Sequence, residues 1–407
     1  MTFKVLQVIP SLASVRGGPT EVAINLTKAL RKQGITVEIV TTNDNGSELL
    51  EVPLQKLTTY RGVPVRFFPR FDVELGRDRG FLFSPSLTQW LWENVRNYDI
   101  LDNHYLFSYS SSCAGAIARW FNVPYTVRTM GQLSPWALAQ SQRKKQLYGT
   151  LLERKNLNKA AAIHCTSLGE VQDVRKFGIQ TSTITLPLGV NLPEIIPNAK
   201  KKLCYEYNLN PELPILLFLS RLHYKKRLEL LLQALYQMKA DRDFYLLIAG
   251  TGETAYIHQI KQQIQDLDLE NNCRFIGFIT GETKDLVLQG SDVFVLPSYA
   301  ENFAIAVAEA LAAGTPVAIT PEIQIAPEIV QADAGLVVEG TIQAFGDAIA
   351  QLLQSPELRS QYGKNGRKLV QERFVWDAIA KRLIPLYQTI IEDRPLPPEA
   401  TTLLKSP

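Results

Sequence analysis

The stretch KVLQVIPSLASVRGGPTEVAINLTKALRKQGITVEIVTT, residues 4–42, places a helical pattern between two short apolar runs. The runs KVLQVI and ITVEIVTT are rich in β-branched residues and have the length of buried strands. Between them a helix is expected from about Pro19 to Gln33, and Gly34 is placed to end it. This order predicts a strand–helix–strand unit, the element from which parallel sheets are built.

The same alternation continues along the chain and occurs twice. In the first half, strands are expected at YDILDNH, PYTVRTM and AAIHCTS. A proline-rich stretch at 186–198 interrupts the alternation, which resumes with PILLFLS, FYLLIAG, CRFIGF, DVFVLPS and PVAIT. We therefore predict an α/β protein of two doubly wound, Rossmann-like parallel-sheet domains, 1–190 and 191–373, whose strand ends face a central cleft. An amphipathic helix at 374–391 follows the second sheet, and the tail 392–407 is expected to be disordered.

The composition is that of an ordinary globular protein. The 407 residues exceed what one hydrophobic core usually serves, and 46% are hydrophobic and 20% charged. A net charge of +3 is too weak to indicate nucleic-acid binding. The four cysteines lack CxxC spacing, so neither a disulfide scaffold nor a zinc site is expected. No secretory leader and no membrane-spanning run is recognisable, which predicts a cytoplasmic protein.

The turn after the first predicted strand carries two consecutive glycines. Gly17 and Gly18 stand directly before Pro19, so exposed backbone N–H groups at a helix start could bind an anion. The spacing is not GxGxxG and no convincing ribose-binding acid ends the second strand, which argues against a nicotinamide oxidoreductase. An ordinary turn that needs glycine explains the pattern about equally well.

Cations and glycines follow the strands of the second half. Arg221 and Lys226 come directly after a buried strand, where two cations suit a diphosphate without a metal, although a solvated basic turn is the simpler alternative. Gly250, Gly252 and Gly277 end two further strands and would let a flat ligand approach the backbone. Together these positions predict a ligand site at the strand ends.

Two carboxylates lie in the almost uncharged segment 298–317. Glu301 and Glu309 could cap and solvate a helix, or they could hold the hydroxyls of a ligand. They are too close along one loop and helix to flank a sugar ring from opposite sides, so a glycosidase pair is disfavoured.

Four segments in a fixed order carry a family resemblance: SRLHYKK, AGTGE, IGF and ENFAIAVAEALAAGTPV. They resemble the retaining GT-B glycosyltransferases of family GT4, also called group 1, of the kind that builds polysaccharides, and the likeness covers nearly the whole chain. The resemblance implies transfer of a hexose from a UDP- or GDP-sugar to a hydroxyl of a saccharide or lipid-linked saccharide. It also implies retention of configuration, no metal or other cofactor, and a last helix, 374–391, that packs back on the first domain.

The resemblance assigns roles to individual residues. It implies that Arg221 and Lys226 bind the diphosphate, that Glu301 holds donor-sugar hydroxyls, that Glu309 binds the ribose, and that His104 faces the donor sugar. The other donor-binding positions that it implies are Gly17, Gly18, Gly250, Gly252, Gly277, Phe278, Asn302, Phe303 and Ala304.

Three residues of the first half are candidates for the acceptor side. Asp102 replaces the first histidine of the family's pair, Gly131 matches a loop that approaches the cleft, and Trp136 could line the acceptor site or fill core. His104 could equally be structural, as a lone histidine after a strand often is. Ala304 stands where the family has glycine, which leaves the donor's identity open.

A basic segment at 142–159 carries lysines and arginines between leucines, at Arg143, Lys144, Lys145, Arg154, Lys155 and Lys159. It could lie on an anionic membrane surface, which would make the protein peripheral on the inner face of the membrane, or it could be a solvated helix. The alternative function is that of a non-catalytic sugar-nucleotide sensor or partner subunit on the same fold. Loss of a charged residue at a strand end would indicate this alternative, but all the expected charged residues are present.

Overall fold

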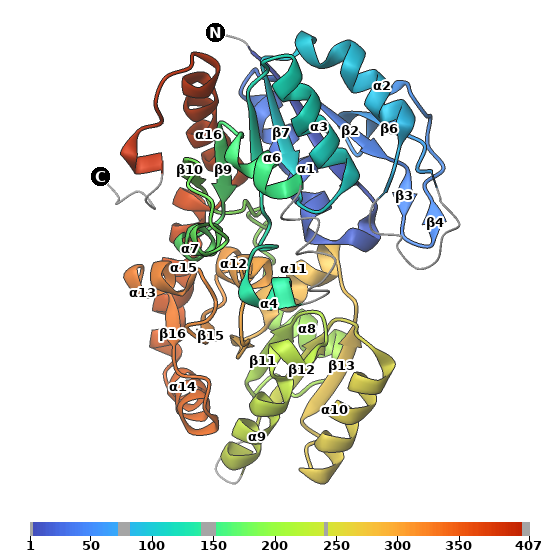
Figure 1. Cartoon of the computed structure of the whole chain (residues 1–407). Helices are drawn as coiled ribbons and strands as arrows, with labels where there is room; N and C mark the ends of the chain where they lie inside the picture. The colour runs from blue at the N-terminus through green and yellow to red at the C-terminus, as the bar shows by residue number, and fades with distance from the viewer. Residues whose placement is uncertain (1–2, 72–81, 140–151, 240–242, 401–407) are drawn as a thin grey trace. The chain divides into compact units, whose positions relative to one another are not determined.

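The computed structural model describes residues 3–71, 82–139, 152–239 and 243–400. The chain divides into two compact units. The amino-terminal unit comprises Met1–Gly189 together with Trp376–Pro407, and the carboxy-terminal unit comprises Val190–Val375. Each unit has its own parallel sheet, which confirms the predicted fold class (Figure 1).

The sheet of the amino-terminal unit has eight strands in the order β10-β9-β8-β7-β1-β2-β6-β5. All neighbours are parallel except β5, which runs antiparallel to β6. The strands are β1 (Lys4–Ser11), β2 (Thr36–Thr42), β5 (Leu57–Tyr60), β6 (Val63–Phe68), β7 (Ile100–His104), β8 (Tyr125–Arg128), β9 (Ala162–Cys165) and β10 (Thr183–Thr185). A small hairpin, β3 (Asp44–Asn45) and β4 (Glu48–Leu49), follows β2.

Helices connect these strands. They are α1 (Gly18–Lys32), α2 (Pro85–Asn94), α3 (Tyr109–Trp120), α4 (Pro135–Ala139), α6 (Arg154–Asn158), α7 (Leu168–Lys176) and α16 (Trp376–Ile391), with 3-10 turns η1 (Ser14–Arg16), η2 (Val95–Asn97) and η5 (Pro398–Ala400). The first of them, predicted from about Pro19, begins one residue earlier, at Gly18.

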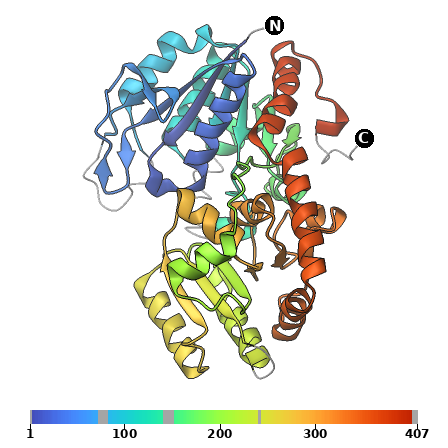
Figure 2. The same cartoon turned by 180° about the vertical axis from the view of Figure 1, so that it is seen from behind.

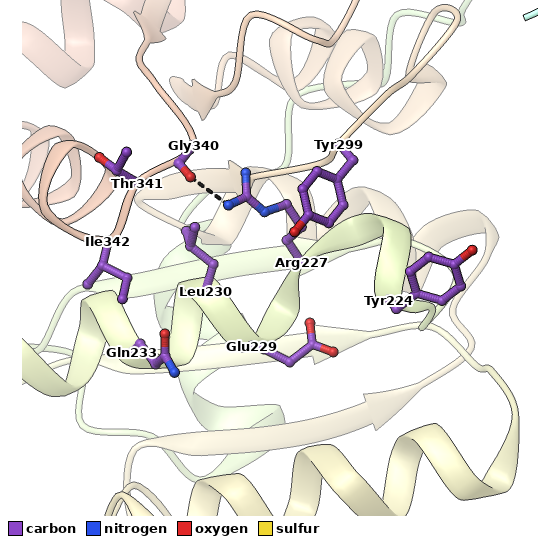
Figure 3. A pocket seen from close by; sticks show the side chains of 9 residues that line it. All are labelled: Tyr224, Arg227, Glu229, Leu230, Gln233, Tyr299, Gly340, Thr341 and Ile342. Carbon is purple, nitrogen blue, oxygen red and sulfur yellow. Dashed lines mark hydrogen bonds between the residues drawn. The ribbon is translucent and has the colours of Figure 1, made fainter. Parts of the chain in front are cut away.

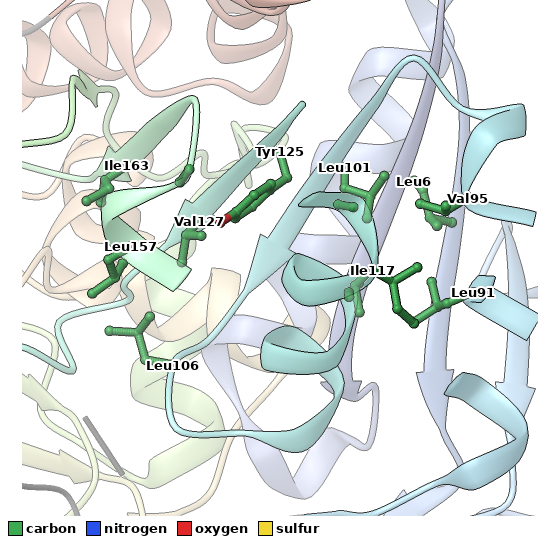
Figure 4. Close-up of a cluster of buried hydrophobic side chains, with 14 of the residues drawn as sticks. Leu6, Leu91, Val95, Leu101, Leu106, Ile117, Tyr125, Val127, Leu157 and Ile163 are labelled. Atoms are coloured by element: carbon green, nitrogen blue, oxygen red, sulfur yellow. The ribbon is translucent and has the colours of Figure 1, made fainter. Parts of the chain in front are cut away.

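Side chains on the two faces of this sheet form separate cores. Leu6 and Leu101 point to one face, where they meet Leu91 of α2 and Ile117 of α3 (Figure 4). Ile9 belongs to the other cluster, under α1, as the alternation of side chains along a strand requires. Helices therefore cover the sheet on both faces.

The last helix of the chain belongs to the amino-terminal unit. Helix α16 packs against α1 (Figure 2). Lys32 of α1 forms a salt bridge with Asp377. Beyond it, the turn η5 contacts β10 and buries Ala400. The tail up to this residue is therefore structured rather than disordered, because it packs on the sheet edge, while 401–407 lie outside the described residues.

The carboxy-terminal unit has six parallel strands in the order β13-β12-β11-β14-β15-β16. They are β11 (Ile215–Leu219), β12 (Tyr245–Ala249), β13 (Cys273–Gly277), β14 (Val293–Leu296), β15 (Val317–Ile319) and β16 (Gly335–Val337). The helical elements are α8 (Ala199–Tyr207), η4 (Tyr224–Lys226), α9 (Leu228–Lys239), α10 (Thr254–Asp266), α11 (Gly281–Gly290), α12 (Ile305–Ala313), α13 (Ala326–Gln331), α14 (Ile342–Gln354) and α15 (Pro356–Arg373).

The strand order of this unit reverses direction between β11 and β14. From β11 the chain moves outward to β12 and β13, and it then returns to the other side of β11 to form β14, β15 and β16. Ligands of open α/β sheets bind at such a switch point, beyond the carboxyl ends of the strands. The loops after β11 and β14 are therefore where a binding site is expected.

Candidate functional site

The loops that meet at the switch point bring together two of the predicted residues. Lys226 ends η4, which follows β11, and its Nζ forms a salt bridge with Oε1 of Glu301 in the loop after β14. The hydroxyl of Ser298 donates to the same oxygen at 2.8 Å. Only 13% of the Lys226 side chain and 12% of the Glu301 side chain are exposed, so the pair is largely shielded from water.

Backbone contacts hold these two loops together. The amide of Tyr299 donates to the carbonyl of Lys225 at 2.9 Å, and the hydroxyl oxygen of Ser298 lies 3.1 Å from the same carbonyl oxygen. The amide of Glu301 donates to the carbonyl of Glu322. The Glu301 carboxylate, for which helix capping was the alternative role, therefore forms an ion pair with Lys226 of another loop.

Arg221 lies on the same loop as Lys226 and is exposed. Its neighbour Leu222 forms a parallel bridge with Gly252. A Cβ on Gly252 would lie 2.0 Å from the Leu222 carbonyl oxygen, and one on Gly250 would lie 1.9 Å from that of Ser220. Both glycines are thus required by the close approach of two strand ends, which is a different reason from the ligand contact that we expected.

The loop after β13 exposes an aromatic ring. Gly277 has φ of +71°, a conformation that favours glycine, and its carbonyl accepts a hydrogen bond from the Gly250 amide at 2.7 Å. The next residue, Phe278, is 74% exposed. The backbone at this strand end is therefore fixed while the ring of Phe278 faces solvent.

Glu309 also pairs with a lysine that sequence reasoning missed. Lys284 of α11 lies with its Nζ 2.6 Å from Oε1 of Glu309 on α12. At the start of α12, Phe303 is buried and Ala304 has φ of +57°, a left-handed conformation that glycine adopts more readily. A glycine at this position would relieve the conformation. Asn302 precedes them in the same loop.

In the amino-terminal unit, the first βα turn is held by a buried carboxylate. Gly17 has φ of +72° and Gly18 is the first residue of α1. Just before them, Arg16 donates to Asp44 through Nε at 2.9 Å, and Arg70 donates to the same carboxylate at 2.5 Å. Asp44 was not a candidate in the sequence, because nothing in its neighbourhood indicates two arginine partners.

Asp102, which we expected on the acceptor side, is fully buried in a network of hydrogen bonds. Its carboxylate accepts hydrogen bonds from Thr126 at 2.9 Å, from Nε of Arg128 at 2.8 Å and from the hydroxyl of Tyr387 at 2.7 Å. Burial alone would raise the pKa of Asp102, but the Arg128 guanidinium, with smaller contributions from His104 and His164, holds it well below the ordinary value. The residue therefore stays ionised and anchors α16 to the sheet.

His104 is fully buried, so in this structure its ring is enclosed by protein rather than presented to a sugar. Its Nε2 lies 3.6 Å from Oδ2 of Asp102, longer than a hydrogen bond. Neither ring nitrogen has a hydrogen-bond partner among the described residues. Burial lowers the pKa of His104 although Asp102 opposes the shift, so the ring is neutral near pH 7.

Gly131 is positioned by a glutamate that we did not predict. Its amide donates to Oε1 of Glu170 at 2.5 Å, and the hydroxyl of Thr129 donates to the same oxygen. The sequence holds a signal for Glu170, because Ser167 and Glu170 match the S-x-x-E capping box, and the Ser167 hydroxyl does accept from the Glu170 amide at 3.1 Å. Trp136 lies in α4, and its side chain is outside the described residues.

The basic segment 142–159 is described only in part. Arg143, Lys144 and Lys145 lie outside the described residues, whereas Arg154 and Lys155 are exposed on α6. Arg154 lies over the ring of Phe177, 5.3 Å from its centroid. Among the described residues, no helix combines the length and apolarity that crossing a membrane requires. The same part of the chain holds no cluster of three or more His, Cys, Asp or Glu arranged to bind a metal.

Comparison with family models gives two matches that together cover most of the chain. Residues 16–194 match the model described as Glycosyltransferase Family 4, and residues 200–369 match Glycosyl transferases group 1. D-inositol 3-phosphate glycosyltransferase 2 of Catenulispora acidiphila is 26% identical over 398 residues, 93% of this chain and 91% of that protein. N-acetyl-alpha-D-glucosaminyl L-malate synthase of Bacillus anthracis is 28% identical over 190 residues, 46% and 49% of the two chains.

Solved structures with the same fold cover nearly all of the chain. Sucrose-phosphate synthase of Thermosynechococcus elongatus superposes with a TM-score of 0.77 at 22% identity, covering 96% of this chain and 100% of that one. HepE of Anabaena, solved with UDP and glucose, has a TM-score of 0.73 at 18% identity, covering 95% and 100%. At these identities the likeness establishes the fold.

Proposed function

This chain belongs to the group 1, family 4 glycosyltransferases of the GT-B fold, and from that premise we propose that it moves a hexose from a nucleoside-diphosphate sugar to a saccharide hydroxyl. We place UDP- and GDP-sugars first among the donors and a saccharide or lipid-linked saccharide as the acceptor. The transfer retains the configuration of the anomeric carbon and uses no metal.

The observation that carries this proposal is the pairing of Lys226 with Glu301 at the switch point, with Arg221 on the same loop. A cation and a carboxylate at one strand edge suit the two ends of a sugar diphosphate. Lys226 and Arg221 can neutralise the phosphate oxygens, and Glu301 can accept hydrogen bonds from sugar hydroxyls. Donor binding then replaces the contact that these two side chains make with each other.

The proposed reaction needs no nucleophile from the protein. The bond between the anomeric carbon and the diphosphate oxygen breaks while Arg221 and Lys226 stabilise the leaving charge. The acceptor hydroxyl oxygen bonds to the anomeric carbon on the same face, and its proton passes to the departing phosphate oxygen. The products are the glycoside and the nucleoside diphosphate, so atoms and charge balance.

The relatives support a nucleotide-sugar donor by analogy. HepE was solved with UDP and glucose, and TarM of S. aureus, another solved structure of this fold, was solved with UDP and a saccharide. We also propose a role in building polysaccharides and contact of 142–159 with an anionic membrane from the cytoplasmic side. Both proposals are supported by the sequence pattern alone.

The test is a transfer assay with the full chain, a panel of UDP-, GDP- and ADP-hexoses and saccharide acceptors, followed by NMR of the product's anomeric proton. We expect transfer from one donor class with retained configuration, and its loss in Lys226→Gln. Lys364→Gln, which removes an exposed lysine on α15, is the matched control and should keep activity. Donor binding without transfer to any acceptor, or an inverted product, would overturn the proposal.

A further inference from the structure

A cavity lies within the carboxy-terminal unit, beside η4 but outside the donor contacts proposed above. It has a volume of about 550 Å³ and opens between η4, the start of α9 and the loops after β14 and β16 (Figure 3). We call it the tyrosine pocket, and the side chains that the argument uses are Tyr224, Arg227, Glu229, Gln233, Tyr299 and Thr341. Its volume falls in the range of cavities that bury small ligands.

The wall of the tyrosine pocket is fixed by Arg227. This residue has φ of +55°, and its Nη2 donates to the carbonyl of Gly340 at 2.5 Å. Its guanidinium also lies over the ring of Tyr299, 4.3 Å from the centroid. A Cβ on Gly340 would lie 2.0 Å from Nη1 of Arg227, so a larger residue there would displace the guanidinium. The arginine therefore joins three loops into a preformed wall, as Figure 3 shows.

Two tyrosine rings line this wall without being buried. Tyr224 is 52% exposed and Tyr299 is 57% exposed, although His223 packs on the first ring and Arg227 on the second, so part of each ring is available to a ligand. Glu229 and Gln233 stand four residues apart on α9, so they lie on one face of the helix and line the pocket together. Flat apolar surfaces beside an amide and a carboxylate are complementary to a ring that carries hydroxyl groups.

The charges in the tyrosine pocket favour a neutral ligand over an anion. Among the side chains that line the pocket, Arg227 carries one positive charge and Glu229 one negative charge, and Nη2 of the arginine is already bound to Gly340. A phosphate or nucleotide would approach the Glu229 carboxylate without a net compensating charge. A hydroxyl can donate to Glu229 and accept from the amide of Gln233, so a polyol satisfies both.

We propose that the tyrosine pocket is an auxiliary binding site for a neutral saccharide, separate from the site that holds the sugar donor. Tyr299 stands two residues before Glu301, and its amide is bonded to the carbonyl of Lys225 at 2.9 Å. A saccharide in the pocket therefore contacts the same two loops that carry Lys226 and Glu301. The site would hold saccharide close to these loops whatever nucleotide the donor carries.

The proposal is tested by direct binding to the full chain rather than by activity. Saturation-transfer NMR and calorimetry are run with glucose, sucrose and maltotriose as saccharide probes, with inorganic phosphate as the anion probe, and with and without excess UDP. We expect saturable binding of at least one saccharide that UDP does not displace. Tyr224→Ala should weaken it about tenfold, as loss of one aromatic contact predicts. Gln233→Ala should weaken it in the same direction.

Tyr205→Ala is the matched control, because this tyrosine of α8 is 92% exposed and does not line the pocket. It should bind the saccharide as the parent does. Circular dichroism of all three variants checks that they fold. Absence of saccharide binding, displacement of the saccharide by UDP, equal weakening in Tyr205→Ala, or a phosphate signal that Tyr224→Ala removes would each overturn the proposal. Failure of sugar transfer with intact saccharide binding would instead count against the proposed function alone.

Discussion

Replacing Tyr387 by phenylalanine tests whether the buried network around Asp102 holds α16 to the amino-terminal unit. The substitution removes the hydroxyl that donates to Asp102 at 2.7 Å and leaves the ring in place. A hydrogen bond to a charged acceptor contributes about 1.5–3 kcal/mol. Asp102 keeps its bonds from Thr126 and Nε of Arg128, whereas Nη2 of Arg128 also loses its long contact of 3.4 Å with this hydroxyl, so we take this range as the scale of the loss.

The assay must report on one helix, because a chain of two units does not unfold as a single two-state system. Hydrogen–deuterium exchange of the α16 amides reports its local opening. At 1.4 kcal/mol for each factor of ten, we expect exchange to become roughly 10- to 150-fold faster. Tyr362→Phe is the control, since it removes the hydroxyl of a buried tyrosine of α15 in the other unit and should leave exchange of α16 unchanged. Unchanged exchange in Tyr387→Phe would refute the anchoring role.

The same network predicts that the amino-terminal unit loses stability in acid. Burial lowers the pKa of His104, and burial with Arg128 lowers that of His164 well below its ordinary value. Because both histidines take up protons more readily when unfolded, stability should fall as the pH drops below about 6.5. Asp102, whose pKa is also lowered, adds a further loss below about 3.9. A melting temperature that stays constant from pH 7 to pH 5 would contradict this reasoning.

Three further predictions concern the carboxy-terminal unit. Glu301→Gln should reduce transfer steeply while UDP binds almost normally, and Glu309→Gln should weaken UDP itself, so equal calorimetric effects on UDP would show that the roles are wrong. Gly250→Ala places a Cβ 1.9 Å from the Ser220 carbonyl oxygen at φ of +132°, and it should destabilise the unit by more than about 1 kcal/mol, seen as a lower melting temperature. Transfer should persist in excess EDTA, and reversible loss there would contradict a metal-independent reaction.

The sequence predicts the layered architecture well, because strand and helix periodicity are local properties. Residues 4–42 alone specify a βαβ unit, and the structure has β1, α1 and β2 there. The strand-end positions of Arg221, Lys226 and Glu301 follow from the same alternation. Which carboxylate meets which cation does not, since Glu301 pairs with a residue 75 positions away and Glu309 with Lys284, 25 positions away.

Sequence periodicity cannot predict which buried polar side chains contact one another. Asp102 lies near the end of a predicted strand, where a ligand contact is expected, yet its partner Tyr387 lies 285 residues later. Only the structure shows that other side chains of the protein donate hydrogen bonds to the Asp102 carboxylate. The reason for Gly250 and Gly252 was likewise not predictable from the sequence. The group that would clash with a side chain at these two positions is the protein's own backbone.

The return of α16 to the first unit has a consequence for biosynthesis. The ribosome synthesises Asp102 and Arg128 early. Tyr387, whose hydroxyl contacts both side chains, is added 285 residues after Asp102. At about 5–20 residues per second, this delay is roughly 15–60 s. During that interval the nascent amino-terminal unit lacks its last helix and exposes the apolar surface that α16 later covers, including its contact with α1. Chains that terminate early should therefore be retained by chaperones or degraded, even when every strand of the first sheet has been made.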